Sequence, residues 1–476
     1  MALALVLLPL AFAAASAALP SNRWRPWLLP VCGAGHFALT IAALSRAEVG
    51  AFGGWLKLDD LGRLVLAVIS VLFFACSLYA PGYLALRPDR SNRVFVPCLF
   101  VFLAMTTLMV ESQHLGLMWV AIEATTLASA PLLHFNHNAR SIEATWKYLL
   151  IGSVGIALAL FGTFFLAYAA LQAGLGSSLF FSELVREAPR LSRPWLHSAF
   201  VLLFVGYGTK MGLAPMHTWK PDAYGEAPGI VGTLLAGALT SCAFLALLRF
   251  FQIVAAGGEV AFARQLMIGI GLLSMAVAAV FMARQRDYKR MLAYSSVEHM
   301  GILVLGIGIG GAGVFGAMLH LVNNAVTKGV LFLSAGNIHR AYGSKSVDDV
   351  RGALRRLPFS GALFLAGFFA VTGSPPFAPF LSEFTIVRAA MTSGHVVVGA
   401  LFLVLLAVVF LGMGGAVLAV VQGDPPPDAP VEFHDRFGTV APIALLMAIV
   451  VLLGVYLPAP VYTLVTNAAA FVDGKP

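Results

Sequence analysis

The sequence predicts an all-α integral membrane protein with about 14 transmembrane helices, and three observations carry this prediction. First, 59% of the 476 residues are hydrophobic and only 11% are charged, whereas soluble domains carry roughly 25% charged residues. Second, apolar stretches of about 18 to 25 residues recur from end to end, each long enough to cross roughly 30 Å of hydrocarbon. Third, these stretches lack strand-like alternation, which favours a helical bundle.

The elements follow in order as apolar segments separated by loops that contain Arg, Asp, Gly or Pro. We expect the spans at residues 1–19, 26–45, 62–83, 94–111, 114–134, 146–172, 195–218, 229–251, 264–283, 291–309, 313–336, 358–391, 396–421 and 439–466. The seventh and twelfth spans contain Gly and Pro clusters at 206–215 and 373–379. Because such clusters weaken a helix, we expect both of these spans to be discontinuous.

The basic residues set the expected orientation. They concentrate in alternate loops, for example at 87–93, 284–290 and 340–356, and loops rich in Lys and Arg stay on the cytoplasmic side. We therefore expect both termini to face outward in a bacterial or archaeal cytoplasmic (inner) membrane. The net charge of +8 is then a topology signal rather than a nucleic-acid footprint. This assignment puts every basic residue in a loop except Lys210 and Lys328.

Cofactor motifs are missing from the sequence. Cys32, Cys76, Cys98 and Cys242 lie far apart without a C-x-x-C spacing, and no nucleotide-binding loop of the Walker or Rossmann kind occurs. We therefore expect no metal or cofactor in this chain, and any redox centre belongs in a partner subunit.

Lys210 lies beside the first predicted helix break. A lysine near the bilayer centre costs about 2.5 to 3.5 kcal/mol, so it is usually paired or hydrated. We expect Glu123, central to the fifth span, to be its counter-ion, with His217 and freed carbonyls holding water nearby. Each group keeps the other charged while they are in contact, and burial favours the neutral form when they separate. Opening and closing of the pair is therefore coupled to proton transfer. The alternative is a static ion pair that fixes helix packing.

Lys328 ends a polar row on the eleventh span. His320, Asn324 and Lys328 are spaced i, i+4 and i+8, so they share one helical face over about 12 Å. Such a row predicts a hydrogen-bonded proton relay; a packing histidine is the alternative.

Three further acidic sites complete the candidates. Glu383 follows the second break. Glu298 and His299 in the tenth span form an acid and imidazole pair that is either part of the relay or interfacial. We expect Glu111, together with His114, to be a solvated cap at a span end.

The two predicted breaks lie five helices apart, which suggests two inverted five-helix repeats, spans 4–8 and 9–13. We expect an N-terminal three-helix segment at 1–93, a first half-channel unit at 94–251, a second at 252–421, and a C-terminal loop with the last helix at 422–476.

Four stretches resemble a known family over roughly residues 60 to 420: 119–123 (WVAIE), 215–223 (PMHTWKPDA), 287–301 (DYKRMLAYSSVEHMG) and 320–336 (HLVNNAVTKGVLFLSAG). They resemble the antiporter-like subunits of respiratory complex I, the Mrp cation/proton antiporters and the membrane-bound hydrogenases. The stretches 140–148 and 153–162 look most similar to the F subunit of hydrogenase-4.

The resemblance implies roles for individual residues. Glu123 and Lys210 match the family's glutamate–lysine pair, Lys328 matches the central lysine, and Glu383 matches the terminal Lys or Glu of the second half-channel. The sequence departs from many relatives where Thr240 and Ser241 replace a Lys or His, and where Asn324 replaces a His.

Together these features predict a proton-translocating subunit of a hydrogenase-4 or complex I-like complex, driven by redox chemistry elsewhere. Its expected partners are further antiporter-like subunits, the membrane anchor of a quinone or hydrogenase module, peripheral iron–sulfur proteins and lipid. One alternative is an Mrp-type sodium or potassium/proton antiporter. Another is a non-conducting membrane anchor, and a third, by fold analogy alone, is energy coupling for bicarbonate uptake.

Overall fold

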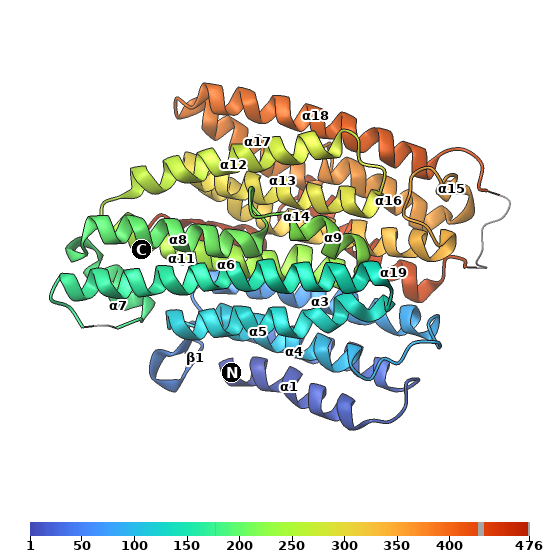
Figure 1. The fold of residues 1–476 in the computed structure, drawn as a ribbon, viewed down its shortest axis with the longest axis horizontal. Helices are drawn as coiled ribbons and strands as arrows, with labels where there is room; N and C mark the ends of the chain where they lie inside the picture. The colour runs from blue at the N-terminus through green and yellow to red at the C-terminus, as the bar shows by residue number, and fades with distance from the viewer. Residues whose placement is uncertain (177, 427–432, 475–476) are drawn as a thin grey trace.

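The chain forms a bundle of helices that run approximately along its longest axis (Figure 1). The structure is a computed structural model and describes residues 1–176, 178–426 and 433–474. The Pro-rich part of the predicted C-terminal loop and Lys475 therefore lie partly or wholly outside the described residues. A short antiparallel hairpin lies between residues 45 and 60, and it is the one two-stranded sheet among the described residues.

The N-terminal half contains these elements: α1 (Ala2–Ala18), η1 (Arg25–Trp27), α2 (Leu28–Leu44), β1 (Gly50–Ala51), η2 (Phe52–Gly54), β2 (Leu56–Lys57), α3 (Asp60–Ala85), α4 (Phe95–Glu111), α5 (Leu115–Leu133), η3 (His134–Asn136), α6 (Ala139–Gln172), α7 (Phe181–Glu187), η4 (Ala188–Arg190), α8 (Arg193–Met211), α9 (Trp219–Glu226), α10 (Gly229–Thr233), η5 (Leu234–Leu239) and α11 (Thr240–Ala256).

In the described residues of the C-terminal half the elements are helices: α12 (Val260–Met282), α13 (Tyr288–Ile309), α14 (Ala312–Tyr342), α15 (Ala353–Arg356), α16 (Pro358–Val371), α17 (Ala378–Thr392), α18 (Val396–Val421), α19 (Phe437–Val455) and α20 (Ala459–Val472). Within the described residues, nine helical segments are long and apolar enough to cross a membrane, and four shorter apolar helices accompany them: α1, α4, α16 and α20. The chain is a multi-pass, all-helical membrane protein.

The helix is interrupted at both places where the sequence predicts a break. α8 ends at Met211 and α9 begins at Trp219, and α16 ends at Val371 and α17 begins at Ala378. The last predicted span, 439–466, is wrong as one continuous helix, because α19 ends at Val455 and α20 begins at Ala459. Pro458 and Pro460 account for this third break, since proline fits the first turn of a helix but not its interior.

Helices α6 and α8 cross closely because small residues line their contact. A Cβ placed on Gly206 of α8 would lie 2.6 Å from the backbone N of Ala159 and the backbone O of Gly155. Gly155 in turn packs against the side chain of Thr209. This close approach holds the C-terminal end of α8, which carries Lys210, against α5 and α6.

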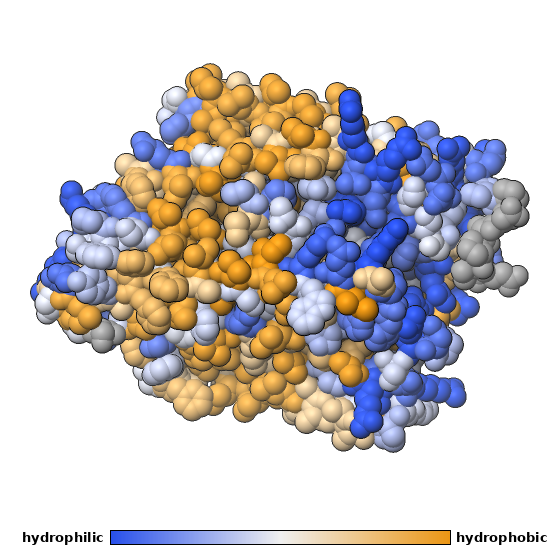
Figure 2. All heavy atoms as spheres, in the orientation of Figure 1, coloured by the Kyte–Doolittle hydropathy of each residue, from blue (hydrophilic) through white to orange (hydrophobic). Residues whose placement is uncertain are grey.

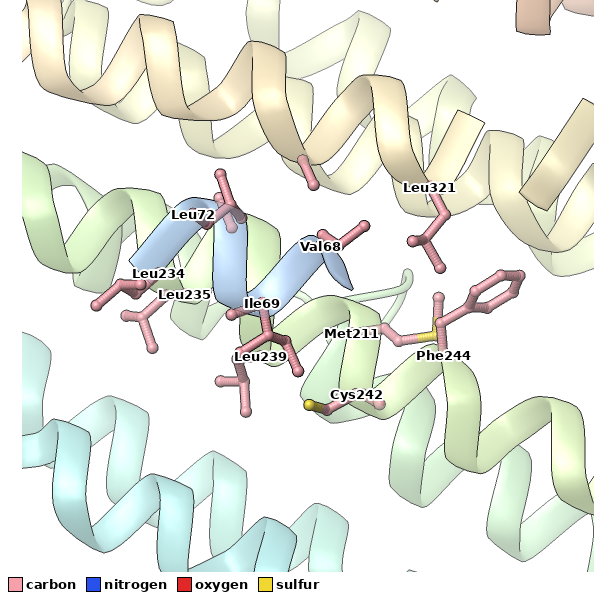
Figure 3. Close-up of a cluster of buried hydrophobic side chains, with 14 of the residues drawn as sticks. Val68, Ile69, Leu72, Met211, Leu234, Leu235, Leu239, Cys242, Phe244 and Leu321 are labelled. Carbon is pink, nitrogen blue, oxygen red and sulfur yellow. The ribbon is translucent and has the colours of Figure 1, made fainter. Parts of the chain in front are cut away.

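The centre of the bundle is built around α3, α11, α13 and α14. Figure 3 shows Val68, Ile69 and Leu72 of α3 between the η5–α11 segment, with Leu239 and others, and α14. All residues of the most apolar windows at Gly229–Ala256 and Tyr288–Ile309 are buried. α13, which carries Glu298 and His299, is therefore one of the innermost helices, whereas α5, which carries Glu123, is about half buried.

The surface divides into an apolar band and two hydrophilic ends. Figure 2 shows hydrophobic residues across the middle and hydrophilic residues at both ends, most densely at the right end, where α15 lies. Both termini lie toward the opposite end of the molecule (Figure 1). This pattern is the one expected of a bundle that spans a bilayer.

The prediction that all other basic residues lie in loops is wrong, because many of them lie within helices, and four of them are also buried. Arg25, Lys220, Arg249 and Lys289 are all buried, with at most 1% of the residue exposed. Arg249 forms an ion pair with Asp59, with 2.8 Å between Nη2 and Oδ2, and Lys289 donates to the backbone O of Ala227 at 2.6 Å. A hydropathy profile along the chain does not reveal such partners, because they come from distant parts of the sequence.

Candidate functional site

The first site sits at the end of α8. Gly212 ends this helix in the left-handed conformation, at φ 75°, and its N–H bonds to the carbonyls of Gly208 and Thr209. Glycine adopts this conformation without the cost that a Cβ would add. Lys210 therefore lies in the last turn of α8, directly before the break.

Lys210 and Glu123 are in contact. Lys210 Nζ lies 3.0 Å from Glu123 Oε2 and also donates to Thr126 Oγ1. Lys210 is 1% exposed, whereas the Glu123 side chain is 20% exposed and accepts a further hydrogen bond from Ser153 at 3.2 Å. One partner is thus inside the bundle, and the other lies between the interior and the outer face of α5 and α6.

His217 lies away from this pair. Within the described residues no hydrogen bond joins it to Lys210, and its ring lies near Phe281 and Tyr294, at 6.3 Å between ring centroids in each case. Lys220 is the charged group that interacts with it electrostatically. His217 therefore belongs with Lys220 rather than with the Glu123–Lys210 pair.

Lys328 is fully buried in the middle of α14. Its Nζ donates to Ser295 Oγ of α13 at 2.6 Å, and the carboxylates of Glu298 and Glu383 interact with it electrostatically. Glu298 is 1% exposed and His299 is 0% exposed, so both side chains lie inside the bundle. α13, α14 and α17 thus each contribute a buried titratable side chain, Glu298, Lys328 and Glu383, and no ion pair joins these three among the described residues.

Two histidines form a hydrogen-bonded chain beside Lys328. Nδ1 of His299 lies 2.9 Å from Nε2 of His320, and Nδ1 of His320 lies 2.9 Å from Ser382 Oγ. Ser382 gives its only proton to the carbonyl of Pro379. His320 must therefore donate to Ser382 and accept from His299. Nε2 of His299 is left without a partner among the described residues.

Glu383 closes the second break. Gly373 is left-handed, at φ 67°, and the Glu383 carboxylate lies where a Cβ on Gly373 would be. Glu383, His299 and His320 offer ligand atoms within 4.8 Å of one another, a spacing that suits a metal ion. The hydrogen bond between the two imidazoles already accounts for this proximity.

The predicted row on α14 is only partly connected. Asn324 is 2% exposed, but its Oδ1 has no partner among the described residues. Its neighbour Asn323 makes the contacts instead, donating to the carbonyl of Ala378 at 2.8 Å and to Ser382 at 3.3 Å. A step of one residue along a helix turns the side chain by about 100°, so Asn323 faces α17 whereas Asn324 points elsewhere.

The sequence alone did not identify several polar residues that lie around the candidates in the structure: Thr126, Ser153, Ser295, Ser296, Asn323, Ser382 and Lys220. The consecutive Ser295 and Ser296, shortly before Glu298, were the one available signal. In contrast, the Thr240 and Ser241 hydroxyls bond to carbonyls of their own helix, Ala236 and Gly237. The η5–α11 segment therefore contributes no titratable group there.

The expectation for Glu111 is wrong. We expected a solvated cap, but Glu111 is fully buried and neither carboxylate oxygen has a partner within the described residues. Glu111 is buried because the hairpin and α1, which are distant in the sequence, cover this end of α4. His114 does cap α5, accepting from the N–H of Leu117.

A charged cavity of about 600 Å³ opens near α9, at the start of α13 and the loop after α14. It is lined by acidic and basic residues, among them Asp222, Glu226, Asp287, Arg290 and Lys345. Pro221, next to Lys220, also lines it. This cavity brings water close to the first break.

The sequence of the chain matches a known protein family. Residues 112–410 match the family model described as NADH:quinone oxidoreductase/Mrp antiporter, TM. The chain is 32% identical over 424 residues to a hydrogenase-4 component F homolog of Methylacidiphilum infernorum, covering 85% of this chain and 86% of the relative. It is 31% identical to NADH-quinone oxidoreductase subunit N of Desulforudis audaxviator, covering 89% and 87%.

Solved structures match almost the whole fold. A chain of an archaeal membrane-bound sulfane sulfur reductase superposes with a TM-score of 0.86 at 23% identity, covering 99% of this chain and 97% of that one. A chain of the Mrp complex from Dietzia gives 0.86 at 19% identity, covering 98% and 97%. A chain of Thermus thermophilus complex I gives 0.83 at 22% identity, covering 99% and 100%. All three are parts of multi-subunit membrane complexes.

Proposed function

Because the chain belongs to the NADH:quinone oxidoreductase/Mrp antiporter membrane family, we propose that it is the proton-translocating subunit of a respiratory complex related to hydrogenase-4 or complex I. Redox chemistry in partner subunits drives it. The supporting observation is a set of titratable groups inside the bundle, from Lys210 with its part-exposed partner Glu123 to the buried Lys328 and Glu383.

The proposed path has three parts. Protons enter from the cytoplasmic side near Glu123 and Lys210, pass laterally through the centre at Lys328, and leave outward by Glu383. The imidazole chain supports the second part: a proton that reaches Nε2 of His299 allows its Nδ1 proton to pass to His320. Electrostatic coupling along the buried axis supplies the drive, since charges interact strongly at low dielectric.

The proposed architecture is 14 membrane crossings with two inverted units, at 94–251 and 252–421, between an N-terminal segment at 1–93 and a C-terminal part at 422–476. The interrupted helices support it, because each unit has one, α8/α9 and α16/α17. The hydrophilic end near α15 faces the cytoplasm in this proposal, and both termini face outward.

We propose further antiporter-like subunits and the membrane anchor of a redox module as partners. The part-exposed Glu123 and Ser153 on the α5 and α6 face support a lateral neighbour. Polar groups at membrane depth are costly against lipid, so a protein surface is the better cover.

Buried polar atoms without hydrogen-bond partners weigh against the alternative of a non-conducting membrane anchor. Oε1 of Glu383, Oε2 of Glu298 and Nε2 of His299 are buried without a hydrogen-bond partner among the described residues. Groups that only lock helices together would be satisfied by protein partners, as most buried polar groups are. Groups that exchange protons with water need a free position.

A sodium or potassium/proton antiporter is the second candidate, supported by the fold match to the Mrp chain. The line of lysines weighs against it, because an ammonium offers no ligand for a cation. Reconstituted complex in proteoliposomes decides between them. Our proposal predicts redox-driven acidification of the lumen that is unchanged when choline replaces sodium and potassium; loss of flux without these ions would contradict it.

A further inference from the structure

The buried Lys220 has no role in the path described so far. It is 0% exposed on α9, and within the described part of the chain no carboxylate pairs with it. A lysine without a counter-ion inside a membrane bundle is costly and therefore calls for a functional explanation. Its immediate contacts are a hydroxyl and an aromatic ring: Nζ donates to Ser296 Oγ at 3.1 Å and lies 5.6 Å from the centroid of Tyr224.

Lys220 and Lys328 are bound to consecutive residues of α13. Lys220 donates to Ser296, and Lys328 donates to Ser295. The two lysines therefore hydrogen-bond to adjacent residues of one helix. A second positive charge near Lys328 favours loss of a proton from one of the two, which is the condition for transfer between them.

Lys220 is also tied to the end of the helix that carries Lys210. Its aliphatic stem packs where a Cβ on Gly212 would lie, and the indole of Trp219 donates to the carbonyl of Thr209 at 2.8 Å. Movement at the end of α8, where the Glu123–Lys210 pair opens and closes, reaches Lys220 through these contacts.

The two helix breaks share this arrangement. At the first break the left-handed Gly212 lies under the side chain of Lys220, and at the second the left-handed Gly373 lies under the side chain of Glu383. In each case the charged residue comes from the helix after the break, α9 or α17. Lys220 thus holds in the first break the place that Glu383 holds in the second.

The neighbouring segment offers no substitute. Thr240 and Ser241 of α11 bond to their own backbone and cannot carry a charge. From these contacts we propose that Lys220 is a proton-relay residue between Lys210 and Lys328, which rests on the proposed function. The Lys220 ammonium gives a proton by way of the Ser296 hydroxyl, and the neutral Lys328 amine takes one up by way of the Ser295 hydroxyl, with a water molecule carrying the proton between the two hydroxyls. Lys220 is left as a neutral amine, and the total charge is unchanged.

The test compares Lys220→Gln with Lys220→His in the assembled complex in proteoliposomes. Both side chains are polar and hydrogen-bonding, but only histidine can accept and release a proton. We expect at least a tenfold loss of proton flux per assembled complex in the Gln variant, with recovery of a substantial part in the His variant. The His variant should also show a new pH dependence, with flux changing near pH 6 to 7.

Lys289→Met is the matched control, because Lys289 is also a buried lysine but bonds to a backbone carbonyl. Its flux per assembled complex should equal that of the native chain. Equal flux in the native and Gln variants overturns the relay role of Lys220 while leaving the proposed function intact. Equal loss in the Gln and His variants also overturns it, since a structural role predicts that result. No flux in the native complex would instead refute the proposed function.

Discussion

Glu123→Gln is the sharpest test of the Glu123–Lys210 pair. The substitution keeps the shape of the side chain and one of the two acceptor oxygens that Ser153 and Thr126 donate to, but it removes the charge that faces the Lys210 ammonium at 3.0 Å. At this separation and an effective dielectric constant of about 20, two unit charges interact with roughly 5 kcal/mol. Removing one partner of a buried pair typically costs about 3 to 5 kcal/mol.

The lower end of that range applies, because the Glu123 side chain is 20% exposed and therefore partly screened. A rise of about 3 kcal/mol in the barrier to proton transfer corresponds to a fall of roughly 100-fold in rate. We therefore expect redox-driven proton flux per assembled complex to fall by about 100-fold, measured with a pH-sensitive dye inside proteoliposomes. Electron transfer by the partner subunits, measured in the same preparation, shows whether the complex remains intact.

The control is Glu187→Gln, which removes a carboxylate that pairs with Arg190 at 3.0 Å on the exposed turn after α7. Its flux should stay within twofold of native. Native-like flux in the Glu123 variant would refute the role of the pair in translocation. Loss of assembly with full flux in the remaining complexes would show that the pair only fixes helix packing.

Three further substitutions test separate parts of the structure. Lys328→Met removes the central ammonium and should lower proton flux about 100-fold in complexes that still assemble; flux within twofold of native would contradict its place in the path. Arg249→Met breaks the fully buried pair with Asp59 and should destabilise the fold by about 3 to 5 kcal/mol, seen as a lower unfolding temperature in detergent, whereas an unchanged temperature would show that the pair adds nothing. Gly206→Val places a side chain 2.6 Å from the backbone of Ala159 and should cost about 1 to 3 kcal/mol; the same change at Gly269, where no atom lies within 4 Å, should be neutral, and equal effects would refute the close α6–α8 contact.

The helix breaks were predictable from sequence, and the reason is local. Pro215 and the glycines before it, like the Pro and Gly residues at 373–379, disturb the helix through their own backbone chemistry. The same logic extends to Pro458, but the apolar residues on either side made 439–466 look like one span. Local backbone preferences thus predict where a helix can stop, and packing decides whether it does.

The candidate site was predictable in part. Glu123, Lys210, Lys328 and Glu383 stand out because a charge in an apolar span is rare and costly. Lys220 and Arg249 did not stand out, since each lies where a span meets a predicted loop. Asn323 and Ser382 were missed because a neutral polar residue in a helix gives no signal until its partner on another helix is known.

The sequence by itself determined the solvent of this protein, the approximate spans and the acidic and basic residues that must be explained. Hydropathy and charge are sums over neighbours in the chain, so they need no three-dimensional information. Only the tertiary structure decided which charges are buried, which serines hold the two lysines of α9 and α14, and that Glu111 is enclosed. Burial and hydrogen bonding depend on helices that meet across tens or hundreds of residues, and no window of sequence contains both partners.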